Sequence, residues 1–247
     1  LSTELEADVA ELICEMVPCA EMVRFGKNGS DATAGAIRAA RAFTRRDHIA
    51  QCGYHGWQDW CIGAKNPNGV PEAVRNLTHT FRYNDIDGLL DILKAHSCAA
   101  IIMEPMATIY PEDGYLEEVR RLATFYGAIL IFDETITGFR FANGGAQEVF
   151  GVTPDLATFG KGLANGFPLS AIAGRRDIMK LFAGDIFFSF TAGGEALSLA
   201  AAKATLLKLK REPVGETRAA RGERLMHGGR ERLQQHCVGA FIHLRGH

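Results

Sequence analysis

The 247-residue sequence has no surplus of charge of either sign: 27 lysines and arginines stand against 29 aspartates and glutamates, for a formal net charge of -2. Without a basic arm or a run of like charge, the chain has no electrostatic reason to bind nucleic acid or an anionic membrane. No apolar run approaches the length of a membrane span, and no signal peptide opens the sequence. The composition is that of a globular protein, since 47% of the residues are hydrophobic and can fill a large core.

The sequence also lacks the spacings of a disulfide framework, a metal site or a Walker A loop. Its cysteines are scattered and include no C-x-x-C pair: Cys14, Cys19, Cys52, Cys61, Cys98 and Cys237. In a chain of this size they indicate reduced thiols in a cytoplasmic protein. We expect no metal, because no paired ligand spacing connects His48, His55, His79 and His96. The motif G-x-x-x-x-G-K-[ST] does not occur.

Short apolar runs alternate with helical spacings along the chain, which predicts an α/β fold. The apolar runs predict strands over 22–25, 48–52, 98–103, 128–133, 156–160, 170–174 and 187–190. Apolar residues at helical spacing predict helices over 4–17, 30–45, 85–96, 114–127, 175–182, 194–211 and 216–235. Glycine and proline predict an irregular stretch over 62–80. Strand 98–103, helix 114–127 and strand 128–133 form a predicted parallel βαβ unit.

The two ends of the sequence suggest a fragment. The chain begins at Leu1 with a helix following at once, and it stops just after an apolar run. We therefore expect a large domain over 1–212, followed over 213–247 by the truncated start of a C-terminal small domain.

Three polar features follow predicted strands, and each has a plain structural alternative. The turn from Asn28 to Asp31 opens a helix and is suited to a phosphate, although Ser30 or Asp31 would cap any helix. Asp133 lies at the carboxyl end of a buried strand, the edge at which open α/β sheets hold ligands. A role as a helix cap or in a structural ion pair is at least as common for such a carboxylate. Lys161 lies between two glycines after a strand and suits a Schiff base, although a solvated turn lysine is commoner.

The combination is more specific than its parts. A phosphate cradle, an acid for a ring nitrogen and a Schiff-base lysine are the protein groups that pyridoxal 5′-phosphate (PLP) requires, and they occur here in a workable order. The sequence therefore predicts a PLP enzyme with Lys161 and Asp133 as its catalytic residues.

Longer motifs carry a resemblance to the class III aminotransferases, which are PLP enzymes of fold type I. The segment EMVRFGKNGSDATAGAIRAARAFT resembles the family's phosphate-binding segment, and IFDETITGFR resembles its D-E-V-x-T-G-F-R signature. DLATFGKGLANGFPLSAIAGRRDIM resembles the lysine segment nearly throughout. The resemblance covers roughly residues 1–210. It implies a mainly parallel sheet with helices on both faces, lacking the family's N-terminal segment and most of its C-terminal small domain.

By this resemblance, ten residues bind the cofactor: Gly29, Ser30, Tyr54, His55, Glu104, Asp133, Thr135, Ile136, Lys161 and Thr191. Tyr54 of GYHGW would stack on one face of the pyridine ring and Thr135 would cover the other, while Glu104 of MEPM would lie near the site. Thr135 stands where the family usually has an aliphatic residue, and Ile136 where many transaminases carry glutamine. Thr191 would reach the PLP phosphate of the neighbouring subunit in a homodimer.

The resemblance also implies a class of reaction, in which an amino group would pass between a small-molecule amino donor and a carbonyl acceptor. The overall pattern is similar to the branch with glutamate-1-semialdehyde 2,1-aminomutase, which moves an amino group within one substrate. The stretch after GYHGW lacks that enzyme's Gly/Ser-rich gating loop. We therefore favour an aminotransferase acting on a semialdehyde or keto sugar, with the aminomutase as the alternative. A non-catalytic fragment that acts only in dimer assembly is a third possibility.

Overall fold

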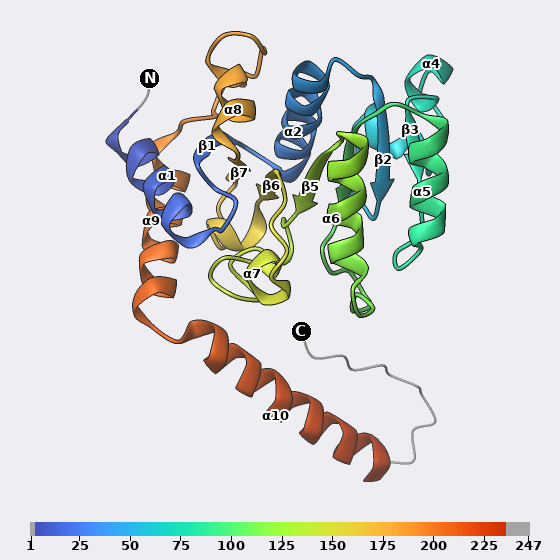
Figure 1. Ribbon diagram of the computed structural model, residues 1–247. Helices are drawn as coiled ribbons and strands as arrows, with labels where there is room; N and C mark the ends of the chain where they lie inside the picture. Colours follow the sequence, from blue (N-terminus) through green and yellow to red (C-terminus); the bar gives the residue numbers. More distant parts are fainter. Residues whose placement is uncertain (1–2, 236–247) are drawn as a thin grey trace.

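A seven-stranded sheet forms the centre of the computed structural model, which describes residues 3–235 (Figure 1). Its strands are β1 (Met22–Gly26), β2 (His48–Cys52), β3 (Thr78–Thr80), β4 (Cys98–Met103), β5 (Ile129–Asp133), β6 (Leu156–Phe159) and β7 (Ser170–Gly174). Their order across the sheet is β1-β7-β6-β5-β4-β2-β3. The strands from β3 to β6 in this order run parallel, while β7 is antiparallel to both β6 and β1. The mainly parallel sheet expected from the sequence is confirmed.

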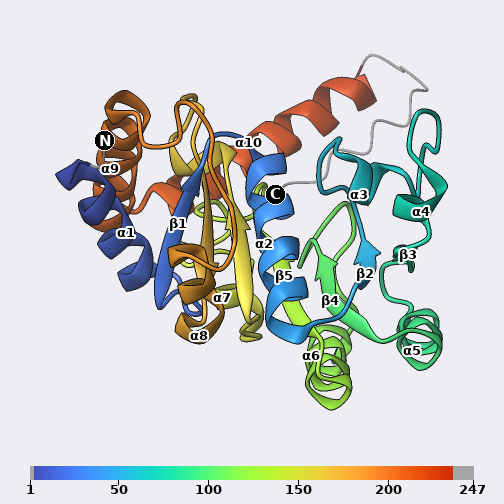
Figure 2. The same cartoon turned by 90° about the horizontal axis from the view of Figure 1, so that it is seen from above.

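Helices cover both faces of the sheet, as predicted (Figure 2). The helices are α1 (Glu4–Met16), α2 (Gly29–Thr44), α3 (Asp59–Ile62), α4 (Glu72–Arg75), α5 (Ile86–Ala95), α6 (Tyr115–Tyr126), α7 (Ala146–Phe150), α8 (Arg176–Met179), α9 (Ala196–Arg211) and α10 (Val214–Gln235). On one face, α2 and α8 pack against Ile102, Ile131 and Ile172. On the other, α5 and α6 cover β4 and β5, while α1 and α9 cover β1 and β7.

Complete burial of the central strands explains why they could be predicted. Every residue of β4, β5, β6 and β7 is buried, so these strands need apolar residues on both faces. Between β4 and β5, α6 begins after Gly114 and ends at Gly127, both in the left-handed conformation. This arrangement is the predicted parallel βαβ unit.

Three expectations about local structure were wrong. Residues 187–190 form no strand, because this segment lies outside the sheet and its aromatic rings pack on one another instead. The stretch 62–80 is not irregular throughout, since it contains α4 and the edge strand β3. The expected helix over 175–182 is a single turn, α8, followed by a 3₁₀ turn over Lys180–Ala183. Helix α7 was not predicted.

The last part of the chain departs from the sheet. After α9, Pro213 precedes α10, which extends away from the sheet in Figure 1. The division into 1–212 and 213–247 remains a prediction, and residues 236–247 lie outside the described part. Among residues 3–235, no helix combines the length and the apolar character needed to span a bilayer.

Candidate active site

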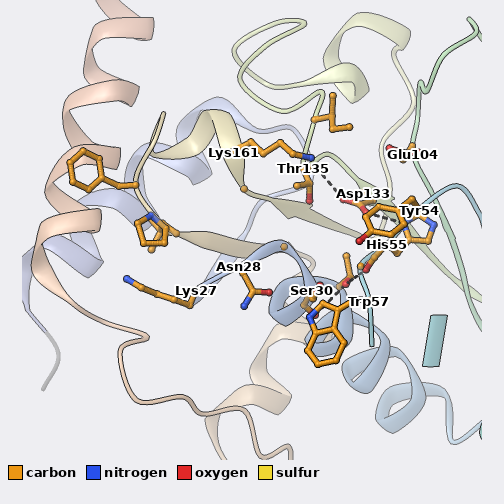
Figure 3. A pocket seen from close by; sticks show the side chains of 18 residues that line it. Lys27, Asn28, Ser30, Tyr54, His55, Trp57, Glu104, Asp133, Thr135 and Lys161 are labelled. Atoms are coloured by element: carbon orange, nitrogen blue, oxygen red, sulfur yellow. Dashed lines mark hydrogen bonds and ion pairs between the residues drawn. The ribbon is translucent and has the colours of Figure 1, made fainter. Parts of the chain in front are cut away.

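A pocket of about 470 Å³ lies where the carboxyl ends of the parallel strands meet the start of α2. Asp133 is the last residue of β5, Glu104 follows β4, and Lys161 follows β6. Figure 3 shows Lys161 extending toward Thr135 and Asp133, while His55 and Tyr54 approach Asp133 from the other side. This is the edge at which open α/β sheets bind ligands.

Nine of the ten residues predicted to bind a cofactor line this one pocket: Gly29, Ser30, Tyr54, His55, Glu104, Asp133, Thr135, Ile136 and Lys161. Thr191 does not line the pocket and is exposed. The structure thus gathers side chains that lie up to 132 positions apart in the sequence, from Gly29 to Lys161.

Asp133 is buried and accepts hydrogen bonds on both of its oxygens. Its Oδ1 accepts from the Thr135 backbone N–H and the Thr158 hydroxyl, both at 3.1 Å. Its Oδ2 lies 2.8 Å from Nδ1 of His55. Burial raises the pKa of Asp133, but the hydrogen bonds and the charge of His55 act against it, and the pKa ends below its ordinary value. Asp133 is therefore held as a carboxylate at the wall of the pocket.

The contacts of His55 indicate which protons the pair carries. Nδ1 faces the carboxylate of Asp133, and Nε2 lies 3.0 Å from the Cys52 carbonyl oxygen. A carbonyl oxygen can only accept, so Nε2 carries a proton. The carboxylate of Asp133 likewise accepts, so Nδ1 of His55 donates to it. The buried pair is thus a charge-assisted hydrogen bond that keeps Asp133 negative.

The backbone at Lys161 is strained. Its φ is 37°, in the left-handed region that residues with a Cβ rarely occupy, and it opens a 3₁₀ turn directly after β6. A larger residue at position 160 would crowd Thr135, because a Cβ there would lie 3.2 Å from Cγ2 of Thr135. Within residues 3–235, the Lys161 amine makes no hydrogen bond or ion pair. Strain of this kind is typical of functional positions.

The start of α2 presents free backbone donors to the pocket. The side chain of Asn28 accepts the N–H of Asp31, and the Asp31 carboxylate accepts the N–H of Asn28 in return. This capping box leaves the N–H groups of Gly29 and Ser30 for a ligand. Thr33 fixes the neighbouring loop, since its hydroxyl donates to the His55 carbonyl at 2.7 Å. The helix start can therefore hold an anion.

Two further polar residues, Thr135 and Glu104, line the pocket. The hydroxyl of Thr135 is buried and has no hydrogen-bond partner within the described residues. Burial raises the pKa of Glu104, as does the charge of Asp133, so Glu104 binds a proton more readily than an ordinary glutamate. Both groups are placed to hydrogen-bond a ligand.

Sequence reasoning missed several residues of the site. Trp57, Phe167 and Leu169 line the pocket, and Thr158 orients Asp133 from the neighbouring strand. All four lie in motifs that the sequence analysis identified, Trp57 in GYHGW and the others in the lysine segment, but no role was assigned to them.

Glu134 turns away from the pocket and holds the loop beneath it. Its carboxylate is completely buried and accepts from the Thr137 hydroxyl and the Ala146 backbone N–H, both at 2.7 Å, and from Gln147. Gly145 cannot be larger, because a Cβ there would lie 2.4 Å from Oε2 of Glu134. Glu134 thus fixes the chain between β5 and α7.

Removing the Glu134 carboxylate is expected to destabilise the fold. Glu134→Ala leaves several buried donors unpaired, which costs about 1–3 kcal/mol each, so the free energy of unfolding should fall by at least about 3 kcal/mol. Urea unfolding followed by circular dichroism measures the loss. Glu117→Ala, at an exposed position on α6, is the matched control and should change stability by less than about 0.5 kcal/mol. Equal stability of the two variants would contradict this role.

Three histidines meet elsewhere, at the other end of β2. His48, His79 and His96 bring ring nitrogens within 4.8 Å of one another, and no carboxylate or thiol joins them among the described residues. Their sequence spacing did not indicate a metal site, because they come from three separate elements.

Comparison with known proteins gives the family. The aminotransferase class-III family matches residues 1–246. The chain is 41% identical to 3-aminobutyryl-CoA aminotransferase of Cloacimonas acidaminovorans over 91% of its own length and 56% of that protein. It is also 41% identical to glutamate-1-semialdehyde 2,1-aminomutase 2 of Lachnoclostridium phytofermentans over 86% of this chain and 54% of that one.

The fold agrees with solved structures. FumI of Sphingopyxis sp. MTA144, solved in its PLP internal aldimine form, superposes with a TM-score of 0.88 at 32% identity, covering 95% of this chain and 58% of that one. The chain spans just over half the length of the curated relatives it matches. Because the match extends over nearly all its residues, the chain belongs to the aminotransferase class-III family.

Proposed function

We propose that the protein binds PLP in this pocket and transfers an amino group between a small amine and a carbonyl compound. One observation carries the proposal: Lys161, Asp133 and the open start of α2 converge on the same pocket. Family membership and the PLP-containing solved relative support it.

The residues present fit PLP. The free N–H groups of Gly29 and Ser30 suit a phosphate, and the unpartnered Thr135 hydroxyl suits a polar group of the cofactor. Gly56 keeps the space open, since its φ is 114° and a Cβ there would lie 2.3 Å from the Ser30 hydroxyl. The carboxylate of Asp133 suits a protonated ring nitrogen.

Each residue then has a chemical task. When bound, PLP supplies a carbonyl that condenses with amines and a ring that withdraws electrons. Lys161 would hold the cofactor through Nζ, and its amine, when free, would move a proton to and from the substrate carbon. Asp133 keeps a proton on the ring nitrogen. His55 keeps Asp133 ionised by donating from Nδ1. Gly29 and Ser30 bind the phosphate, while Tyr54 and Thr135 contact opposite faces of the ring.

The Gly56 position offers a test of the phosphate cradle. We expect Gly56→Ala to weaken PLP binding at least about tenfold, because the added methyl group displaces Ser30, and about 1.4 kcal/mol of lost contact is enough for that change. Absorbance titration with PLP measures it. Gly69→Ala is the matched control, since Gly69 also has a positive φ, of 82°, but has open space for a Cβ. Unchanged PLP affinity in Gly56→Ala would show that the phosphate binds elsewhere than beside Ser30.

The reaction class rests on the relatives and has two candidates. We favour amino transfer between two substrates, a small amine donor and a carbonyl acceptor such as a semialdehyde or keto sugar. The similarity to aminomutases at equal identity supports the second candidate, transfer within one molecule. An assay without any added acceptor distinguishes them: only an aminomutase converts a single amino-carbonyl substrate to completion.

We also propose a cytoplasmic homodimer. Two aromatic residues of the pocket are exposed: the exposed fraction is 72% for Trp57 and 60% for Tyr54. A second subunit would cover such a surface. Thr191, exposed and outside the pocket, would then reach the partner's cofactor phosphate. Cys19, Cys52 and Cys98 are free and buried, which suits a reducing compartment.

Titration with PLP tests the proposal as a whole. Purified protein is titrated with PLP, the visible absorbance band is followed, and the complex is reduced with borohydride and digested. We expect one PLP per chain and a label on Lys161. A panel of small amines should then bleach the band in unreduced protein. Failure of PLP to bind, or labelling elsewhere, would overturn the proposal.

A further inference from the structure

His48, His79 and His96 form a cluster at the far end of the parallel strands from the pocket. His48 is the first residue of β2, His79 is the middle residue of the edge strand β3, and His96 follows the last residue of α5. The pocket lies at the opposite end of β2, where Cys52 contacts His55. The five residues of β2 span about 13 Å, so the two sites are separate.

Sheet register explains why the three side chains meet. His48 and Ala50 are two residues apart on β2 and therefore point to the same face. His79 is paired with Ala50, so it shares that face. Ala50 packs in the core formed with Leu89 and Leu93 of α5, which covers this face. The end of α5 then delivers His96 to the other two rings.

The three rings lie close together. Nδ1 of His48 lies 3.0 Å from Nε2 of His79, and the rings of His79 and His96 stack at 3.7 Å with an angle of 11°. A hydrogen bond between two imidazoles requires that one of the facing nitrogens is unprotonated.

We propose that His48, His79 and His96 bind a divalent transition-metal ion such as Zn²⁺. Neutral imidazole is a preferred ligand of Zn²⁺, Ni²⁺ and Cu²⁺, and the absence of carboxylate ligands from the cluster disfavours Mg²⁺ and Ca²⁺. All three rings are partly exposed, so water can complete the coordination sphere. The carboxyl end of α5 adds a partial negative charge.

Binding requires only a modest local adjustment. Ligand nitrogens at the Zn–N distance of about 2.0–2.1 Å in a tetrahedral site lie about 3.3 Å apart, against separations of up to 4.8 Å here. His48 and His96 adjoin turns, so their rings can move without disturbing the sheet. The guanidinium of the neighbouring Arg46 donates to the carbonyl oxygens of Cys98 and Tyr126.

Calorimetric titration of untagged, metal-free protein with Zn²⁺ tests the site. We expect one Zn²⁺ per chain, together with a rise in Tm. His79→Gln keeps the size of the side chain and should weaken binding by at least about tenfold, the loss that even second-shell partners of metal ligands cause. His227→Ala, on α10 outside the cluster, is the matched control and should bind as the unchanged protein does.

A direct measurement of the ligands does not depend on any variant folding. X-ray absorption at the zinc edge should show three imidazole ligands and no sulfur. Sulfur ligands, or equal Zn²⁺ affinity in His79→Gln and the unchanged protein, would overturn the proposal. Neither readout uses enzymatic activity or PLP, so this inference stands or fails separately from the proposed function.

Discussion

Replacing Lys161 with alanine is expected to lower the rate of amine conversion by at least about 1000-fold. The reason is that the proposed function gives the side chain two tasks, since Nζ would hold the cofactor and then move the substrate proton. A positioned acid–base group alone contributes about 10²–10⁴ to the rate. The fold should survive, because Lys161 is exposed to the pocket and its amine makes no hydrogen bond or ion pair within residues 3–235. Stopped-flow bleaching of the visible band by the best amine measures the rate.

Lys180→Ala is the matched control for this experiment. Lys180 is exposed, lies 19 positions further along and does not line the pocket. It should retain the original rate and the original borohydride label. The free energy of unfolding of Lys161→Ala should be unchanged or slightly higher. Alanine keeps the left-handed φ of this position, so the backbone strain remains, but it has no side-chain rotamers to lose on folding. A Lys161→Ala protein that still converts amines would remove the lysine from the mechanism.

The central fold could be predicted because its signals are local. Strands such as β4 and β5 are buried on both faces, so each is a continuous apolar run, and α6 between them is bounded by glycines. The same reasoning failed at 187–190, where an aromatic run mimics a strand. Aromatic side chains favour strands only when a neighbour offers a ladder, and no strand of the sheet pairs with this segment. The antiparallel direction of β7 had no local signal.

The candidate site was predictable where it lies in contiguous motifs. Asp133 and Lys161 each follow a strand, and topology brings the carboxyl ends of neighbouring parallel strands together. Long-range pairings were not predictable. The bond from His55 to Asp133 joins positions 78 apart, and the one from Thr158 joins positions 25 apart. The histidine cluster shows this most clearly, since only the register of β2 with β3 reveals it.

Replacing Asp133 with asparagine should lower turnover by about 10²–10³, the loss typical of removing one preorganised electrostatic group from an active site. Asparagine has nearly the same shape but only one oxygen, so it can keep the bond from Nδ1 of His55 while its amide nitrogen replaces Oδ1 beside Thr158 and the Thr135 backbone N–H. The asparagine amide is neutral, however, and therefore cannot hold a proton on the ring nitrogen. Electrons released from the substrate then have a weaker acceptor. PLP should still bind through Lys161 and the start of α2.

Two readouts separate the electrostatic role of Asp133 from a structural one. If its negative charge is what matters, Asp133→Asn should keep the borohydride label on Lys161 while losing turnover. Stability should fall by only about 1.5–3 kcal/mol, the cost of weakening a hydrogen bond to a charged group. Asp113→Asn, in an exposed loop, should match the unchanged protein in both measurements. Wild-type turnover in Asp133→Asn would contradict the assignment of a ring-nitrogen partner. Loss of both label and fold would instead show that the buried His55–Asp133 pair acts through stability.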